Sequence, residues 1–169
     1  MNTASMRGLA ALAMIAACSL AASTERPVRK PADAVALVQR AADFIKHNGR
    51  ARALAAFNAP KGDFVDGELY IFAFDLKGDG TVRANGAFPH LVGKNLMGLT
   101  DPDGVAITRK ILETANSKEG KGWIHYKWPN AMHGRNVEAK TSYIERAGDL
   151  AIGCGIPAQW ASASMGGGR

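Results

Sequence analysis

The segment from Trp123 to Trp128 (WIHYKW) concentrates aromatic and basic side chains on a predicted strand. Because side chains alternate across a strand, Tyr126 and Trp128 share one face with Ile124, whereas His125 lies on the other. A phenol or an indole gives a binding pocket both an apolar wall and a directed hydrogen bond. The segment is therefore either the wall of a pocket or a piece of ordinary core with one solvated face.

Lys140 lies inside the next strand pattern, Val137 to Arg146, rather than in a loop. A cation with hydrogen-bond donors is what a buried anionic ligand requires, because an unpaired anion is very costly to bury. The alternative interpretation is a solvated lysine on an outer face. Tyr143 lies on the opposite face of a regular strand, so Lys140 and Tyr143 meet one ligand only if a bulge intervenes or one of them acts from a second layer.

The sequence gives little support for catalysis or for a metal site. The histidines and cysteines show neither His-x-x-x-His nor Cys-x-x-Cys spacing. The segment Asp75 to Gly80 resembles the start of a calcium loop, but the twelfth position is Gly86 instead of glutamate, which indicates a turn. Cys154 falls on an apolar alternation, and no motif pairs it with His125 or His133 as a nucleophile. We expect no enzyme, no metal and no cofactor.

The charge of the chain is basic but dispersed. The 169 residues, enough for one domain, include 21 Lys and Arg against 15 Asp and Glu, a net charge of +6. These charges are intermixed along the chain and form no basic stripe interleaved with aromatic residues. We therefore expect no nucleic-acid partner.

The first residues have the pattern of an export signal. One cation in Met1 to Arg7 precedes an apolar run from Gly8 to Ala17, which is too short to span a membrane as a helix. We predict a signal peptide over residues 1–22 and a linker over 23–31. The alternative is a lipoprotein signal ending at residue 17, with Cys18 lipidated. Both predict a periplasmic or secreted protein of the bacterial envelope, lipid-anchored through Cys18 in the second case.

The rest of the chain predicts an α+β fold. Apolar residues recur at steps of three and four from Asp33 and over Arg50 to Phe57, and alternate over Glu68 to Asp75, where Tyr70 falls on one face. An Asp101-Pro102 pair predicts the start of another helix. The remaining expected strands are Thr81 to Ala84, Gly122 to Trp128, Val137 to Arg146 and Leu150 to Ile156. The sum is an antiparallel sheet of about five strands with a long N-terminal helix and the helices gathered on one side, followed by a disordered tail over 158–169.

Six blocks in this order resemble a known family. They run from Ala56 to Asp75 and then comprise LVGKNL, DPDG, GWIHYKWP, KTSYI and GCGI. Together they resemble a single Cache domain of the second type over residues 32–157. The family implies a PAS-like fold with a pocket for small molecules, often short carboxylates. Its members commonly carry a His-Pro pair after the hairpin, where this chain has Phe88-Pro89-His90.

This resemblance, with the residues above, predicts a sensing domain that binds a small organic acid or similar metabolite without a covalent step and without its own transmitter. The expected pocket residues are Tyr126, Trp128, Lys140, Tyr143, His90 and Tyr70. The alternative is an interaction module that docks a membrane-bound sensor protein and whose pocket is vestigial.

Overall fold

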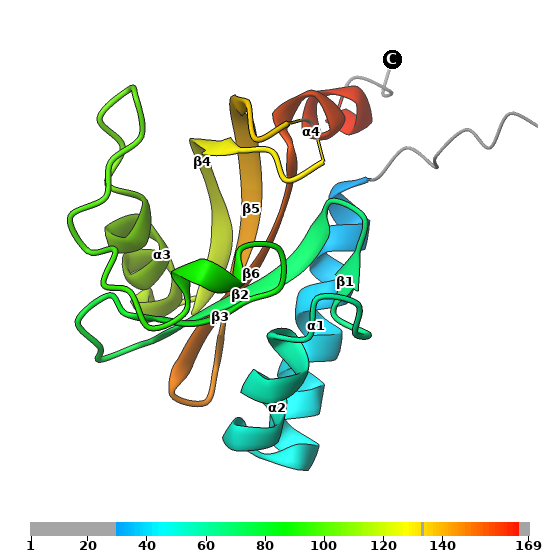
Figure 1. Cartoon of the computed structure of the whole chain (residues 1–169), viewed down its shortest axis with the longest axis vertical. Coiled ribbons are helices and arrows are strands. Elements are labelled where there is room, and N and C mark those ends of the chain that lie inside the picture. Colours follow the sequence, from blue (N-terminus) through cyan, green and yellow to red (C-terminus); the bar gives the residue numbers. More distant parts are fainter. Residues whose placement is uncertain (1–29, 133, 166–169) are drawn as a thin grey trace, which may run out of the picture.

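A six-stranded antiparallel sheet forms the centre of the computed structural model, which describes residues 30–132 and 134–165 (Figure 1). The strands follow the spatial order β1-β2-β6-β5-β4, and β3 pairs with β2. Their bounds are β1 Val65–Asp66, β2 Leu69–Asp75, β3 Val82–Asn85, β4 Lys121–Pro129, β5 Val137–Ala147 and β6 Leu150–Pro157. The helices are α1 Pro31–Asn48, α2 Arg50–Phe57, η1 Pro89–Leu91, α3 Ile107–Asn116 and α4 Ala158–Met165.

The predicted α+β class and antiparallel sheet are confirmed. The first helix ends at Gly49, whose φ of 78° suits glycine, and the second helix begins directly after it, as the sequence indicates. Strand β2 is buried on both faces from Leu69 to Phe74 because its alternate residues lie in two apolar cores, one on each side of the sheet, and both its edges are paired, one with β6 and the other with β1 and β3. The presence of apolar residues on both faces of β2 therefore agrees with its central position in the sheet.

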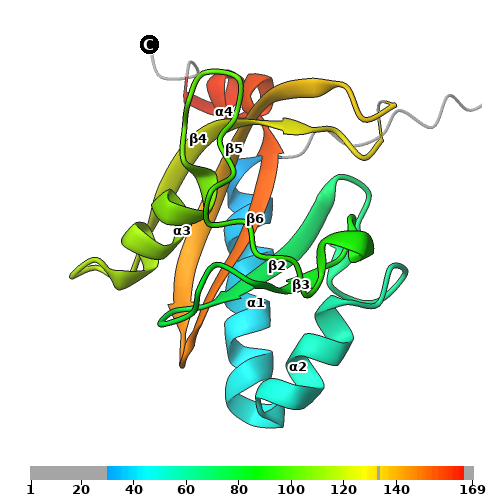
Figure 2. The same cartoon turned by 60° about the vertical axis from the view of Figure 1, so that its left-hand side comes forward.

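Helices cover both faces of the sheet, so the expectation that they gather on one side is wrong. Helix α1 runs along one face, against β5 and β6, whereas α3 lies on the other, against β4 and β5 (Figure 2). Each face has its own apolar core. Ile71, Cys154 and Tyr143 lie in the α1 core, and Phe72, Tyr126 and Ile144 lie in the α3 core. The sheet is the wall between these two cores.

The predicted disorder after residue 157 is wrong for Ala158–Met165, which form α4. Ala161 is 5% exposed, and Trp160 packs against the α1 core. Apolar burial therefore holds this segment as a helix. The prediction gave too much weight to the glycines at 166–168, which lie outside the described residues.

Asp101 does not start a helix as its sequence pattern predicts, because α3 begins at Ile107. Its carboxylate is buried and accepts three backbone N–H groups, from Asp103 and Val105 at 2.9 Å each and from Lys127 at 2.8 Å. Burial raises the pKa of Asp101, but the three N–H groups outweigh it and hold the pKa below its usual value. Asp101 thus attaches the loop before α3 to strand β4.

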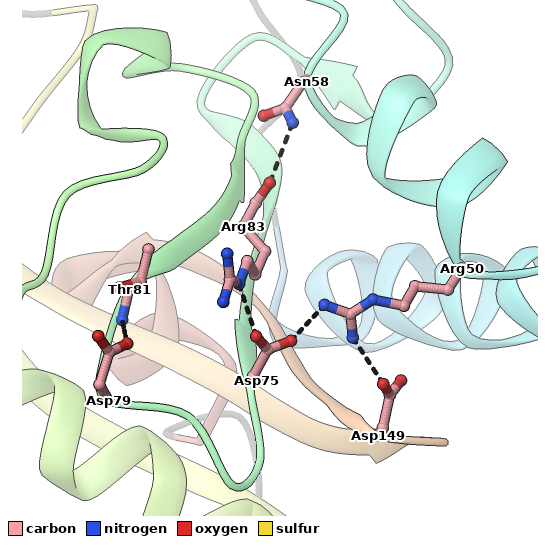
Figure 3. Close-up of polar contacts among 7 residues, drawn as sticks. All are labelled: Arg50, Asn58, Asp75, Asp79, Thr81, Arg83 and Asp149. Atoms are coloured by element: carbon pink, nitrogen blue, oxygen red, sulfur yellow. Dashed lines mark hydrogen bonds and ion pairs between the residues drawn. The ribbon is translucent and has the colours of Figure 1, made fainter.

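A second polar cluster joins α2, β2, β3 and the β5–β6 turn at the other end of the sheet (Figure 3). Asp75, at the end of β2, accepts hydrogen bonds from the guanidinium of Arg50 on α2 and, at 2.6 Å, from that of Arg83 on β3. Arg50 also donates to Asp149 in the β5–β6 turn at 2.7 Å. Burial raises the pKa of Asp75, but Arg50 and Arg83 outweigh it and lower the pKa. The carboxylate is therefore ionised and paired at neutral pH.

We expect Asp75→Asn to lower the free energy of unfolding by about 1 kcal/mol at neutral pH, because the two guanidinium groups are partly exposed and screened. The folded-state pKa of Asp75 is depressed, so its contribution is present above the unfolded-state pKa of about 3.9 and is lost as the pH falls through the folded-state value. Urea unfolding of both proteins across acidic pH tests this. The exposed Asp43→Asn variant on α1 is the control, and a difference that persists under strong acid would contradict the assignment.

Candidate functional site

Lys140 extends from β5 across the neighbouring strand to reach β2. Its Nζ donates to the hydroxyl of Tyr70 at 2.8 Å and lies 4.2 Å from the centre of the Tyr70 ring. Between them lies Gly155 of β6, where an added Cβ would come within 2.2 Å of Lys140 Cε. Because glycine has no side chain, the lysine stem can lie flat across this strand.

Tyr126 and Ser142 lie beside Lys140 on the same face of the sheet. In the β4–β5 register, Tyr126 is directly opposite Lys140, and Ser142 is two residues further along β5. The two hydroxyl groups form a buried hydrogen bond of 2.8 Å. Trp128 follows two residues after Tyr126, and their ring centres are 6.2 Å apart. We refer to Lys140, Tyr70, Tyr126, Ser142 and Trp128 as the Lys140 cluster.

Both tyrosines of the cluster are neutral phenols. Burial raises the pKa of Tyr70 far above its ordinary value, and a smaller opposing effect comes from Trp128. Burial also raises the pKa of Tyr126 to about 12, although the Lys140 charge opposes that shift. Each phenol therefore keeps its proton and can donate a hydrogen bond at any physiological pH.

The ammonium group of Lys140 is poorly compensated. Burial lowers its pKa, and electrostatic interactions with Tyr126, Cys154 and Glu68 oppose that shift only in part. No carboxylate of the described residues lies within ion-pair distance, 4.0 Å, of Nζ. Tyr70 accepts one of its three N–H groups, which leaves two for another acceptor.

Two small voids flank Trp128, each of about 20 Å³. The first is lined by Tyr70, Tyr126 and Trp128 together with apolar side chains of β2 and α3. The second is lined by Lys140, Gly155, Glu68 and the first residues after β4. Each void has room for about one water molecule.

Four of the six predicted pocket residues, Tyr70, Tyr126, Trp128 and Lys140, meet at this cluster. Tyr143 does not, because β5 pairs without a bulge and places it on the opposite face, where its hydroxyl donates to Glu145 at 3.2 Å.

His90 is the sixth predicted residue, and it also lies outside the Lys140 cluster. It lies in η1, is exposed, and lines an outer groove beside Phe88. Neither of the two small voids is lined by His90.

No role was assigned to Ser142 or to Gly155 from the sequence. The position of Ser142 was predictable, because it follows Lys140 by two residues on β5 and therefore lies on the same face of the strand. Gly155 accommodates the Lys140 stem, and an added Cβ at Gly153 would come within 2.4 Å of the Phe72 ring. Lys140 on β5 reaches Tyr70 on β2 across β6, and a contact between such distant residues leaves no periodic pattern in the sequence.

The structure offers Cys154 no role as a nucleophile. The thiol is buried on the α1 side of the sheet, and burial raises its pKa to about 12 despite the nearby Lys140 charge. His125 contacts the Thr141 hydroxyl at 2.9 Å. Among residues 30–132 and 134–165, no group of three or more His, Cys, Asp or Glu side chains could hold a metal ion.

No helix in the described part of the chain has the length and apolar character needed to cross a membrane. The predicted signal segment, the lipidation candidate Cys18 and His133 lie outside the described residues.

The chain matches the family model described as Cache domain over residues 46–161. Among curated proteins, the chain is similar to the sensor histidine kinase MctS of Rhizobium johnstonii, with 35% identity over 75 residues. That alignment covers 44% of this chain and 15% of the kinase. The chain thus spans a small part of the kinase's length.

Solved structures with the same fold include a methyl-accepting chemotaxis protein from Vibrio parahaemolyticus, with a TM-score of 0.61 and 24% identity over 75% of this chain and 86% of that one. A periplasmic sensor domain of a chemotaxis protein gives 0.58 and 22%, over 75% and 88% of the two chains. A Cache chemosensory domain whose structure is titled for carboxylic acid recognition gives 0.57 and 21%, over 75% and 86%. At these identities the likeness establishes the fold.

We expect Cys154 to react with iodoacetamide at least about 100-fold more slowly in the folded protein than in urea, since burial removes both access and thiolate. Mass spectrometry of the alkylated chain measures both rates. Rapid alkylation under native conditions would show an accessible thiolate and would reopen the nucleophile hypothesis.

Proposed function

This chain belongs to the Cache domain family, and from that premise we propose that it binds a short organic carboxylate at the Lys140 cluster. The fold it shares with chemoreceptor sensor domains supports a sensory rather than a catalytic role. Carboxylic acid recognition is the subject of one solved neighbour, which supports this ligand class without fixing the acid.

The observation that carries the proposal is an excess of hydrogen-bond donors around a half-buried cation. Tyr70 already accepts from Lys140, so its own proton is available to a further acceptor. The Tyr126–Ser142 pair uses one of its two hydroxyl protons, which leaves the other to donate. A carboxylate supplies the missing acceptors and the missing negative charge together.

The available space supports a small ligand that enters by displacing water and shifting side chains. Each void holds about one water, so even a two-carbon acid requires Trp128 or its neighbours to move. Trp128 is partly exposed and borders both voids, which makes it the side chain whose movement would join them.

The proposal also includes the location of the protein and its signalling partner. The protein acts in the periplasm or outside the cell after removal of residues 1–22, or is anchored there through a lipid on Cys18. In this proposal the domain passes its signal to a membrane-bound sensor protein.

A second candidate function rests on the same small voids. If they never open, the pocket is vestigial and the domain acts by docking a membrane-bound sensor. The two readings differ in one measurable property, because only the first requires an acid to stabilise the isolated protein.

We expect acetate, propionate or lactate to raise the melting temperature of the protein, and Lys140→Met to weaken binding of the active acid about 100-fold or more, since the buried anion would lose its cation. Isothermal titration calorimetry measures the affinity, and acetamide tests the need for charge. Lys46→Met on the exposed side of α1 is the control, because it removes an equal charge.

Unchanged binding of the acid by Lys140→Met would contradict the role of Lys140 as the cation that pairs with the acid. If no acid stabilises the protein, the carboxylate proposal fails, and capture of a membrane sensor from envelope extracts then tests the docking alternative.

We expect the affinity for the acid to fall as the pH rises from neutral to alkaline. The pKa of Lys140 is lowered in the free protein, and a bound anion raises it, so binding takes up a proton above the free-state value. Affinity is constant below that pKa and falls by up to about tenfold per pH unit above it. In Lys140→Arg, whose guanidinium stays protonated, the slope should vanish. A flat profile for the unmodified protein would contradict a titrating lysine at the site.

A further inference from the structure

An apolar groove of about 360 Å³ lies on the outer side of Trp128. Its walls come from η1, the loop before α3, and the ends of β4 and β5. The apolar residues that line it are Phe88, Leu91, Leu99, Ile107, Trp128 and Val137. Trp128 separates this groove from the two small voids of the Lys140 cluster, since it borders all three spaces.

Two of the charged side chains that line the groove, Asp101 and Lys127, already have polar partners, and the other polar side chains of the lining are His90, Thr100 and Arg135. The carboxylate of Asp101 accepts three backbone N–H groups. Lys127 pairs with Asp103 at 2.8 Å. Arg135 has no acidic partner among the described residues, and its guanidinium lies 5.8 Å from the centre of the Phe88 ring.

The backbone holds Arg135 at this position. Its φ of 62° is uncommon for a residue with a side chain, and its N–H donates to the carbonyl of Asn130 at 2.9 Å, which closes the β4–β5 loop. The Phe88 ring attracts the exposed guanidinium without neutralising its charge, so its N–H donors stay available to an anion.

We propose that this groove is a second binding site, for an amphipathic carboxylate whose apolar body lies against Phe88, Trp128 and Val137 and whose acid group pairs with Arg135. Apolar walls with one uncompensated cation select a ligand that has both parts. An acid larger than the space that movement of Trp128 would open at the Lys140 cluster would bind in this groove instead. The site depends on Arg135 and not on Lys140.

Calorimetric titration of the full chain with phenylacetate and octanoate tests the proposal, with phenylacetamide as the uncharged analogue. We expect at least one acid to bind, Arg135→Gln to weaken its binding about tenfold, and Val137→Asp to weaken it further by placing a carboxylate on the wall. The matched control is Arg52→Gln, which removes an equal charge from an exposed position on α2. In Lys140→Met, binding of the larger acid should be unchanged.

Several outcomes would overturn the second site. They are the failure of both acids to bind, equal binding by Arg135→Gln and Arg52→Gln, and binding of phenylacetamide as tight as that of phenylacetate. Loss of the larger acid in Lys140→Met would also overturn it, because that acid would then occupy the inner cluster. If only the short acids fail to bind, that result contradicts the carboxylate site at the Lys140 cluster and leaves the groove proposal standing.

Discussion

The ammonium group held over the ring of Tyr70 is the constraint on which the rest of the site depends. Its stem crosses β6, so position 155 must lack a side chain, and its head needs an acceptor on β2, which the Tyr70 hydroxyl provides. The hairpin of β5 and β6 and the distant strand β2 thereby all contribute to one feature. Because neither Tyr70 nor Tyr126 ionises, the cluster keeps a positive character that the fold itself does not neutralise.

Alternation along the strands made much of this arrangement predictable. Tyr126 and Trp128 are two residues apart on β4 and therefore share a face. Lys140 lies on the same face because β4 and β5 pair with Tyr126 directly opposite Lys140. Tyr70 joins them because β2 is central and its even-numbered residues face the α3 core. The same alternation places Tyr143 on the opposite face of β5 from Lys140, so the sequence itself indicates that Tyr143 lies outside the cluster. A bulge in β5 could have brought Tyr143 to the Lys140 face, but β5 pairs regularly with both its neighbours.

Other features depended on contacts that no local pattern records. Asp101 has the sequence context of a helix cap, but tertiary bonds to Lys127 N–H on β4 and to its own loop use the carboxylate differently. Helix α4 exists because Trp160 and Ala161 find an apolar surface beneath them, which a glycine-rich ending does not suggest. In both cases packing overrides a local preference of about 1 kcal/mol or less.

The placement of charge distinguishes binding from structure in this fold. Arg50, Arg83 and Lys127 have carboxylate partners, and these pairs fasten a helix, a hairpin and a loop. Lys140 and Arg135 instead lie over aromatic rings with no described carboxylate in ion-pair distance. An aromatic ring positions a cation without cancelling its charge, so the attraction for an anion survives at both places. The net charge of +6 therefore says less about partners than the location of these two cations on either side of Trp128.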